Sequence, residues 1–294
     1  MHRELTQALA STTSPALDLV GLGPLMGLSA GSPEVGIGLV DGPVAIGHPD
    51  LAGASIHAVG AGGSACRRSG SEACVHGTHV AGILAARRGS AAPAIAPACT
   101  LLVRPIFEEA NADGTLPLAT PDDVARAIVE CVDAGARIIN LSAATGEPTI
   151  RVEASLRHAL DHVMRRGALV VAAAGNQGTL GSSEITRHPG VIPVVGYDLE
   201  GRPMAHSNFG RSAGRWGLGG PGAGIVSLDA VPRFGTSFAA PFVAGTLALL
   251  WSLFPDADAA RLRRALSHGL RRTTVIPPLM NAQTAHEALK SGLQ

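Results

Sequence analysis

Short apolar segments recur along the chain between stretches of helical character, and this alternation constrains the fold more than any other feature. Five segments have the length and composition of buried strands: Val35–Val40, Thr100–Val103, Ala136–Leu141, Ala168–Ala173 and Val191–Val195. Strands that alternate with helices pair in parallel and are covered by helices on both faces. We therefore expect an α/β fold in which a mainly parallel central sheet forms the middle of three layers.

The helical segments carry clear end signals. Thr120 is a good N-cap for a helix over Pro121–Ala134, and Asp122 and Asp123 suit the positive end of its dipole. Gly135 then supplies the stop. Three further helices are predicted at Arg151–Arg166, Phe234–Pro255 and Asp256–Leu270, and a tail without clear pattern begins at Pro277.

The chain divides into a short N-terminal part and one large domain. Residues 1–34 are rich in Ser, Thr, Pro, Gly and Ala without periodicity, which predicts an arm or short presegment. Residues 35–294 are long enough and apolar enough for a single α/β domain. We find no secretory signal in the first residues, so the sequence favours a cytoplasmic location.

Charge and aromatic content argue against two classes of partner. The 23 basic and 23 acidic residues cancel, and one Tyr with two Trp is too few for a nucleic-acid stacking platform. The uncharged segment Phe234–Pro255 is long enough for a membrane span, but its internal Gly and Pro favour a buried core helix. We expect neither a nucleic acid nor a membrane as partner.

Four cysteines are too few for a disulfide scaffold of this length, and they lack paired zinc-site spacing. Cys66 and Cys74 could close a small disulfide loop, whereas Cys99 and Cys131 have the character of small core residues.

Four polar side chains stand where strands end or helices begin. Asp41 and Asn176 each follow a predicted strand, whereas His76 and Ser237 each open a predicted helix. Alone, each has an ordinary structural explanation, as a turn residue or a helix cap. Together they supply a nucleophile, a base, an acid that orients the base and an oxyanion donor, in the order Asp, His, Ser.

The segments around these residues resemble the subtilase family of serine endopeptidases. The three signature segments are Val40–Gly42, His76–Gly82 and Gly235–Pro241, and the likeness extends to Ile139–Ser142 and His188–Gly196. It covers roughly residues 35–255. The resemblance implies a three-layer subtilisin-like fold and hydrolysis of peptide bonds.

Catalytic roles follow from the resemblance. Ser237 would attack the peptide carbonyl, His76 would take and return the proton, and Asp41 would orient the imidazole. Asn176 would stabilise the oxyanion. Two sets of substrate-binding residues are implied: Ser142, Ala143 and Ala144 as a strand that pairs with the substrate, and Ala173, Ala174 and Gly175 as the lining of a roomy pocket.

Two departures from secreted subtilases point to a specialised substrate. Pro43 stands in a segment, Asp41–Leu51, that is similar to the proteases that mature cyanobactins and related ribosomal peptides. In addition, 34 leading residues are few for the folded prodomain of secreted relatives. The expected partner is therefore a peptide or protein substrate, with a precursor peptide as the specialised possibility.

Alternative functions stay open at this point. A peptide macrocyclase would transfer the acyl group to an amine, but ring-forming relatives carry a helical insertion where this chain has only 34 residues between Asp41 and His76. A peptide-binding pseudoenzyme would keep the cleft without turnover. A metal-dependent hydrolase would use His76 with His79, or His158 with His162.

Calcium stabilises many subtilases, but this sequence offers only weak acidic candidates. Asp113-Gly114 and Asp256-x-Asp258 lack recognisable ligand spacing. We expect no metal and no cofactor.

Overall fold

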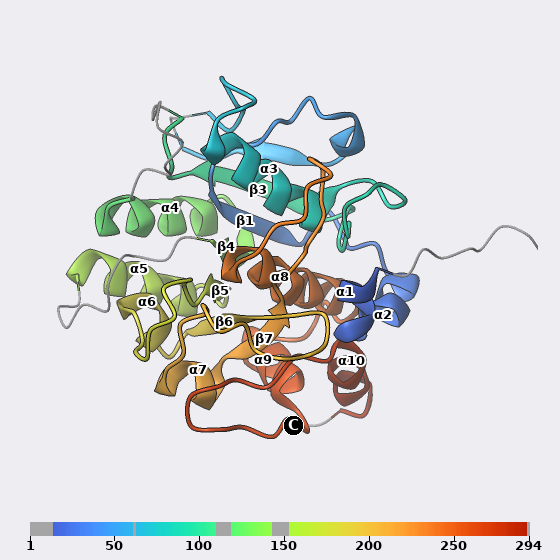
Figure 1. The fold of residues 1–294 in the computed structure, drawn as a ribbon, viewed down its shortest axis with the longest axis vertical. Coiled ribbons are helices and arrows are strands. Elements are labelled where there is room, and N and C mark those ends of the chain that lie inside the picture. The colour runs from blue at the N-terminus through green and yellow to red at the C-terminus, as the bar shows by residue number, and fades with distance from the viewer. Residues whose placement is uncertain (1–13, 61–62, 110–118, 143–152, 293–294) are drawn as a thin grey trace, which may run out of the picture.

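The computed structural model describes residues 14–60, 63–109, 119–142 and 153–292. Within these residues a parallel seven-stranded sheet has the strand order β2-β3-β1-β4-β5-β6-β7 (Figure 1). Its strands are β1 Gly36–Asp41, β2 Ile56–Ala58, β3 Thr100–Pro105, β4 Ala136–Leu141, β5 Leu169–Ala173, β6 Val191–Tyr197 and β7 Leu218–Pro221. The sheet is the middle layer of the expected α/β fold.

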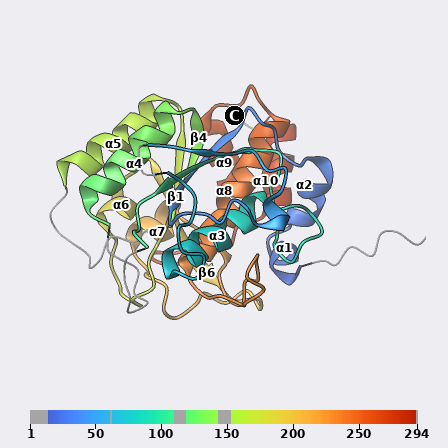
Figure 2. The same cartoon turned by 90° about the horizontal axis from the view of Figure 1, so that it is seen from above.

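Helices cover both faces of this sheet (Figure 2). The helices on one face are α4 Pro121–Asp133 and α5 Ala154–Arg165, and on the other α3 Glu72–Ala85 and α8 Thr236–Leu253. Neighbouring residues of β4 belong to different cores, since Ile138 packs with the α3 and α8 side and Ile139 with the α4 and α5 side. Burial on both faces explains why the strands are continuous apolar runs.

All five predicted strands are present, with ends that differ by one or two residues. The sequence did not predict β2 or β7, which are short. Two of the four residues of β7 are glycine, and the edge strand β2 is partly exposed. Such segments have no apolar run that could mark them.

The predicted end signals of α4 are confirmed. The hydroxyl of Thr120 accepts a hydrogen bond from Asp123 N at 3.1 Å, and Gly135 has a positive φ of 100°. Helix α5 begins at Ala154, whereas the predicted start at Arg151 lies outside the described residues. The helix predicted at Asp256–Leu270 is shorter, as α9 Ala259–Ser267.

The prediction of an N-terminal arm is wrong for the described residues of this segment, which are folded onto the core. Residues 15–28 form α1 Pro15–Leu19 and α2 Leu22–Leu28, with Leu22 and Leu25 buried. The guanidinium of Arg88 donates hydrogen bonds to the carbonyl oxygens of Met26 and Ser29. These helices are too short to show periodicity and are held by tertiary contacts.

The prediction of a C-terminal tail without clear pattern is also wrong. This segment contains α10 Ala282–Lys290, which Asn281 caps by accepting a hydrogen bond from Thr284 N at 2.9 Å. Ala282 N donates to the carbonyl of Val20 at 2.8 Å. The two ends of the described chain therefore pack against each other on the α8 side of the sheet.

Helix α8 is the one described helix with the length and composition of a membrane span, and 89% of that window is buried inside the fold. This agrees with the predicted buried core helix. Cys66 and Cys74 are joined in a disulfide, and Cys99 and Cys131 are free and buried. The structure thus decides the pairing of Cys66 and Cys74, which the sequence left open, and confirms Cys99 and Cys131 as core residues.

Candidate active site

Asp41 and His76 form a hydrogen-bonded pair at the carboxyl edge of the sheet. Asp41 is the last residue of β1 and is fully buried. His76 lies in the second turn of α3, and its Nδ1 donates to Asp41 Oδ1 at 2.7 Å. The same oxygen accepts from Gly42 N at 2.6 Å. Because Asp41 accepts the hydrogen bond from Nδ1–H, the proton of the neutral imidazole stays on Nδ1, and Nε2 is unprotonated and able to accept a proton.

Two glycines allow α3 to approach the end of β1. A methyl group on Gly42 would lie 1.9 Å from the carbonyl oxygen of Ala73, and one on Gly77 would lie 2.4 Å from the carbonyl oxygen of Gly42. Backbone on both sides of the contact leaves no side chain that could move away. The close approach therefore requires glycine at both positions and seats His76 against Asp41.

Opposing electrostatic influences act on the pKa of the His76 imidazole. Burial, the largest influence, lowers the pKa of His76, but the charge and hydrogen bond of Asp41 together with the charge of Glu72 outweigh it. Arg233 acts in the opposite direction. The pKa of His76 is therefore raised above its ordinary value.

Ser237 is the second residue of α8, at the positive end of that helix. Its hydroxyl donates to the carbonyl oxygen of Ser142 at 3.0 Å, and in the described part of the chain no hydrogen bond joins it to His76. The next residue, Phe238, has its ring centroid 5.1 Å from that of His76. The starts of α3 and α8 are thus in contact, and rotation of the Ser237 hydroxyl is needed before it can reach the imidazole.

Asn176 lies just beyond β5 and is fixed by the first residues of α8. Its Oδ1 accepts from Thr236 N at 2.9 Å. Thr236 in turn accepts through Oγ1 from Gly175 N at 3.1 Å. These bonds leave the NH₂ group of Asn176 able to donate beside Ser237.

The predicted substrate-binding residues fall into two groups. Ser142 is buried at the end of β4, where its hydroxyl accepts from Asn140 Nδ2 at 3.1 Å, whereas Ala143 and Ala144 lie outside the described residues. Ala173 ends β5, and Ala174 and Gly175 follow it, with Gly175 at a positive φ of 103°. Ser142 and Gly175 both contact the first turn of α8.

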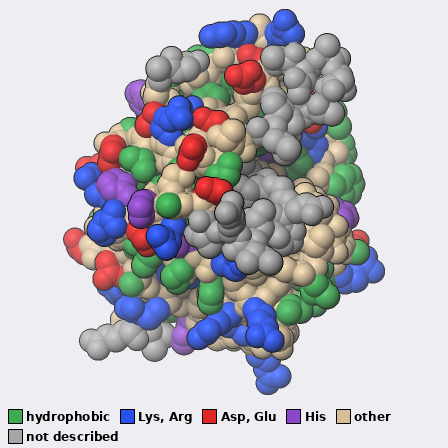
Figure 3. All heavy atoms as spheres, turned by 90° about the vertical axis from the view of Figure 1, so that its left-hand side faces the viewer, with side chains coloured by type: hydrophobic (Ala, Val, Ile, Leu, Met, Phe, Trp, Pro, Cys, Tyr) green, Lys and Arg blue, Asp and Glu red, His purple; other side chains and the backbone are tan. Residues whose placement is uncertain are grey.

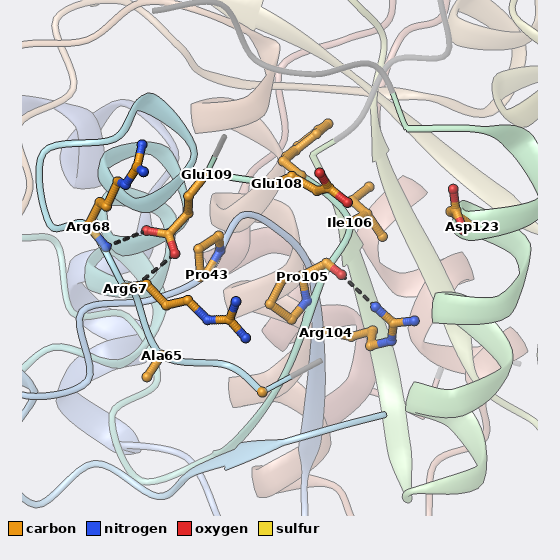
Figure 4. A pocket seen from close by; sticks show the side chains of 12 residues that line it. Pro43, Ala65, Arg67, Arg68, Arg104, Pro105, Ile106, Glu108, Glu109 and Asp123 are labelled. Atoms are coloured by element: carbon orange, nitrogen blue, oxygen red, sulfur yellow. Dashed lines mark hydrogen bonds between the residues drawn. The ribbon is translucent and has the colours of Figure 1, made fainter. Parts of the chain in front are cut away.

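A pocket of about 550 Å³ opens beside this site, at the carboxyl ends of β1 and β3 (Figure 4). Pro43, two residues after Asp41, forms part of its wall. On one side, Glu109 accepts from the backbone N–H groups of Arg67 and Arg68 at 2.8 and 2.9 Å. The pocket is therefore lined by charged side chains of both signs.

The alternative metal ligands have other partners. His79 Nδ1 donates to Asp229 Oδ1 at 2.9 Å, His162 pairs with Asp133, and His158 is exposed. Asp229 was not predicted from the sequence, because the loop that contains it has no periodic pattern and because Asp229 lies 150 residues from His79 along the chain.

Among the calcium candidates, Asp258 instead caps α9, since it accepts from Arg261 N at 2.6 Å. Asp113 lies outside the described residues. The structure therefore gives Asp258 the role of a helix cap and does not test Asp113 as a calcium ligand.

Comparison with known proteins identifies the family. The sequence pattern of the Subtilase family matches residues 32–285. The chain belongs to the subtilase family. This subtilase is 38% identical to the "Thermophilic serine proteinase" of Bacillus sp. (strain AK1) over 184 residues, which are 60% of this chain and 42% of the relative. It is 27% identical to Fervidolysin of Fervidobacterium pennivorans, over 86% of this chain and 39% of the relative.

Solved structures give closer agreement in length. A mutant of the protease domain of PatA superposes on this subtilase with a TM-score of 0.81 and 32% identity, over 89% of this chain and 97% of that one. The prenylagaramide maturation protease PagA has a TM-score of 0.78 and 29% identity, over 92% and 98%. Against the first curated relatives, this subtilase spans only 39% to 51% of their length. The subtilisin-like fold and the membership of the subtilase family are thus established for the domain.

Proposed function

We propose that this chain hydrolyses peptide bonds through Asp41, His76 and Ser237, and that its substrate is a precursor peptide. The observation that carries the proposal is the 2.7 Å hydrogen bond from His76 to a fully buried Asp41, at a sheet edge that also receives the N-terminus of α8. Buried Asp–His pairs beside a serine at a helix start suit acyl transfer.

Acylation begins when the Ser237 hydroxyl turns from the carbonyl of Ser142 toward His76. Hydrogen bonds of this kind are often incomplete before substrate binds. His76 Nε2 accepts the proton as Oγ attacks the carbonyl carbon, and Asp41 stabilises the imidazolium through Nδ1–H. The imidazolium then protonates the departing amine, which leaves an acyl ester on Ser237 that water hydrolyses by the same steps in reverse order.

Charge that develops on the carbonyl oxygen has two sources of stabilisation. The dipole of α8 gives a positive local potential around Ser237, the second residue of that helix. The NH₂ group of Asn176 adds a hydrogen bond, which is typically worth about 2.7–4 kcal/mol in the transition state. The bond from Thr236 N to Asn176 Oδ1 holds that amide in place in advance.

A precursor peptide suits this site and the relatives. PatA and PagA are described as maturation proteases, and both superpose over nearly their full length. We place the substrate backbone along Ser142, Ala143 and Ala144 as an added strand, and a substrate side chain against Ala173, Ala174 and Gly175. The pocket beside Pro43 offers room for a further side chain.

The decisive experiment compares purified wild type with Ser237→Ala on a diverse peptide mixture, with products read by mass spectrometry. We expect linear fragments from the wild type and a loss of about 10⁶-fold in the variant, with unchanged thermal stability. Ser252→Ala, at the other end of α8, is the matched control and should cleave like the wild type. Equal product from wild type and Ser237→Ala would refute the proposed mechanism.

The same experiment separates the alternatives. PatG macrocyclase domains share the fold, with a TM-score of 0.79 at 23% identity, which says nothing of the reaction here. Products lighter than the hydrolysis product by one water would show cyclisation. A pseudoenzyme would bind peptide equally well with and without Ser237. We further propose that no metal takes part, so activity should survive a chelator.

A further inference from the structure

A second histidine lies directly behind the proposed base. His79 is one turn beyond His76 on α3, and the ring of Phe238 packs against both, with centroid distances of 4.8 and 5.1 Å. Phe238 follows Ser237 in the chain. The packing of these three rings therefore sets how the helix that carries the base meets the helix that carries the nucleophile.

His79 is buried and held by an aspartate from another part of the chain. It is fully buried, and burial lowers its pKa in spite of the neighbouring Asp229. Its Nδ1 donates to Asp229 Oδ1 at 2.9 Å, and its buried Nε2 has no partner within the described residues. Asp229 thus fixes both the tautomer and the ring orientation.

Asp229 belongs to an ionic chain that returns to the start of α3. Arg233 Nε donates to Asp229 Oδ2 at 2.7 Å, and Arg233 Nη1 lies 3.5 Å from Glu72 Oε1. Glu72 is the first residue of α3. This ionic chain therefore connects Glu72 with His79, two residues of α3 that lie on either side of His76.

The segment that carries Asp229 and Arg233 is itself pressed onto α3. It lies between β7 and α8 and reaches across the sheet to α3 in orange (Figure 1). Ser227 Oγ donates to the carbonyl oxygen of His79 at 2.8 Å. A methyl group on Gly82 would lie 2.2 Å from that same Oγ. Three residues after Arg233 the backbone enters the first turn of α8 at Thr236.

We propose that Asp229 and Arg233 are positioning residues, whose ionic chain clamps α3 to the segment that leads into Ser237. They act through His76, because the clamp fixes α3 on both sides of it. The inference rests on the proposed peptidase function and adds residues that the three-residue mechanism does not include.

The clamp also sets the charges around His76. Four titratable or charged groups face it: Asp41 from β1, Glu72 and His79 from α3, and Arg233 from the clamp. Glu72 raises the pKa of His76 and Arg233 lowers it. His76 must be neutral to accept the Ser237 proton, so the reaction rate falls below the pKa of His76. Loss of the Glu72 charge should therefore move this acid limb of the pH profile to lower pH, and loss of the Arg233 charge should move it to higher pH.

The test uses phosphonylation of Ser237 by an organophosphorus fluoride, which needs no knowledge of the natural substrate. In this reaction Oγ bonds to phosphorus, fluoride leaves and His76 takes the proton. We expect Arg233→Gln to lower the plateau rate about tenfold, because small misplacements of catalytic groups are costly, and to move the acid limb to higher pH. Glu72→Gln should move that limb to lower pH.

Controls separate positioning from general damage. Arg87→Gln removes an arginine just beyond the other end of α3, with its guanidinium 2.9 Å from Asp50, and should leave the profile unchanged. Arg233→Lys keeps the charge, so it should restore the acid limb even where Arg233→Gln folds poorly. Asp229→Asn should lower the plateau.

Two results would overturn the inference. If the rate-against-pH profiles of Arg233→Gln and Glu72→Gln match the profile of Arg87→Gln, the proposed clamp is contradicted. The proposed peptidase function would not be affected by that result. A wild-type protein that is not labelled at Ser237 would instead overturn the proposed function, and the inference with it.

Discussion

Asp41 combines two properties that the base requires. It is fully buried, and one of its oxygens accepts both from His76 Nδ1 and from Gly42 N. Its charge and hydrogen bond oppose the burial that would otherwise lower the pKa of His76. Orientation and electrostatics of the imidazole therefore depend on the same carboxylate.

Replacing Asp41 by Asn should test both properties. We expect kcat to fall about 10⁴-fold, because the amide keeps the shape but no longer selects the tautomer. Without the charge, burial dominates and the pKa of His76 falls, so the residual activity should persist to lower pH. The measurement is kcat/KM against pH, with Asp50→Asn, at a half-buried aspartate that pairs with Arg87, as the control. An acid limb that does not move would contradict this account of His76.

Asn176 offers a second test at single residues. Asn176→Ala should lower kcat by about 10²–10³-fold with little change in KM, because the amide acts on charge that develops in the transition state. Asn208→Ala is a matched control, since the Oδ1 of Asn208 accepts hydrogen bonds from Gln177 N and Thr179 N, which lie in the segment directly after Asn176. An equal loss in both variants would indicate damage to the segment instead of a lost donor.

At the scale of elements, the start of α3 is fastened by the loop before it. The disulfide between Cys66 and Cys74 closes this loop and ends inside the first turn of α3. Glu109 accepts from the Ser71 hydroxyl at 3.1 Å as well as from the loop backbone. The loop thus precedes His76 by a few residues and limits how the helix start can move.

Removing the disulfide should therefore reduce both stability and activity. A loop of this length predicts a loss of about 2.5 kcal/mol in the free energy of unfolding by the chain-entropy estimate. Urea titrations with and without a thiol reductant measure it, alongside kcat. A double variant, Cys66→Ser with Cys74→Ser, should be insensitive to reductant. Unchanged stability of the reduced wild type would contradict the expected role.

At the scale of the whole molecule, the two described ends of the chain complete the core together. Helix α2 contributes Leu22 and Leu25 to the same core as α8 and α10. On the left part of the face that Figure 3 shows, acidic and basic side chains are intermixed, in line with the balanced total of 23 each. Apolar burial joins the ends to the domain, together with the hydrogen bonds that Arg88 donates to the carbonyl oxygens of Met26 and Ser29.

Two leucines of α2 test this packing. Leu25→Ala should lower the free energy of unfolding by about 2–5 kcal/mol, because it removes a fully buried side chain. Leu28→Ala on the same helix should change it by no more than about 0.5 kcal/mol, since Leu28 is 59% exposed. Urea unfolding of both variants measures the difference. Equal effects would mean that α2 is not part of the cooperative core.

The sequence by itself determined five of the seven described strands and the residues of the proposed triad. Buried parallel strands are continuous apolar runs, and Thr120 and Gly135 mark a helix by local chemistry, so both are legible without a structure. Asp41, His76 and Ser237 could be found because each stands in a short distinctive segment.

Only the tertiary structure decided what short or aperiodic segments do. Helices α1 and α2 have no strong local preference and are held because they bury leucine and alanine side chains in the core that α10 also joins. The contact of Asp229 with His79 spans 150 residues, and no local pattern encodes it. Burial and long-range contact are properties of the packed chain, which is why the arm, the tail and the clamp appeared only in three dimensions.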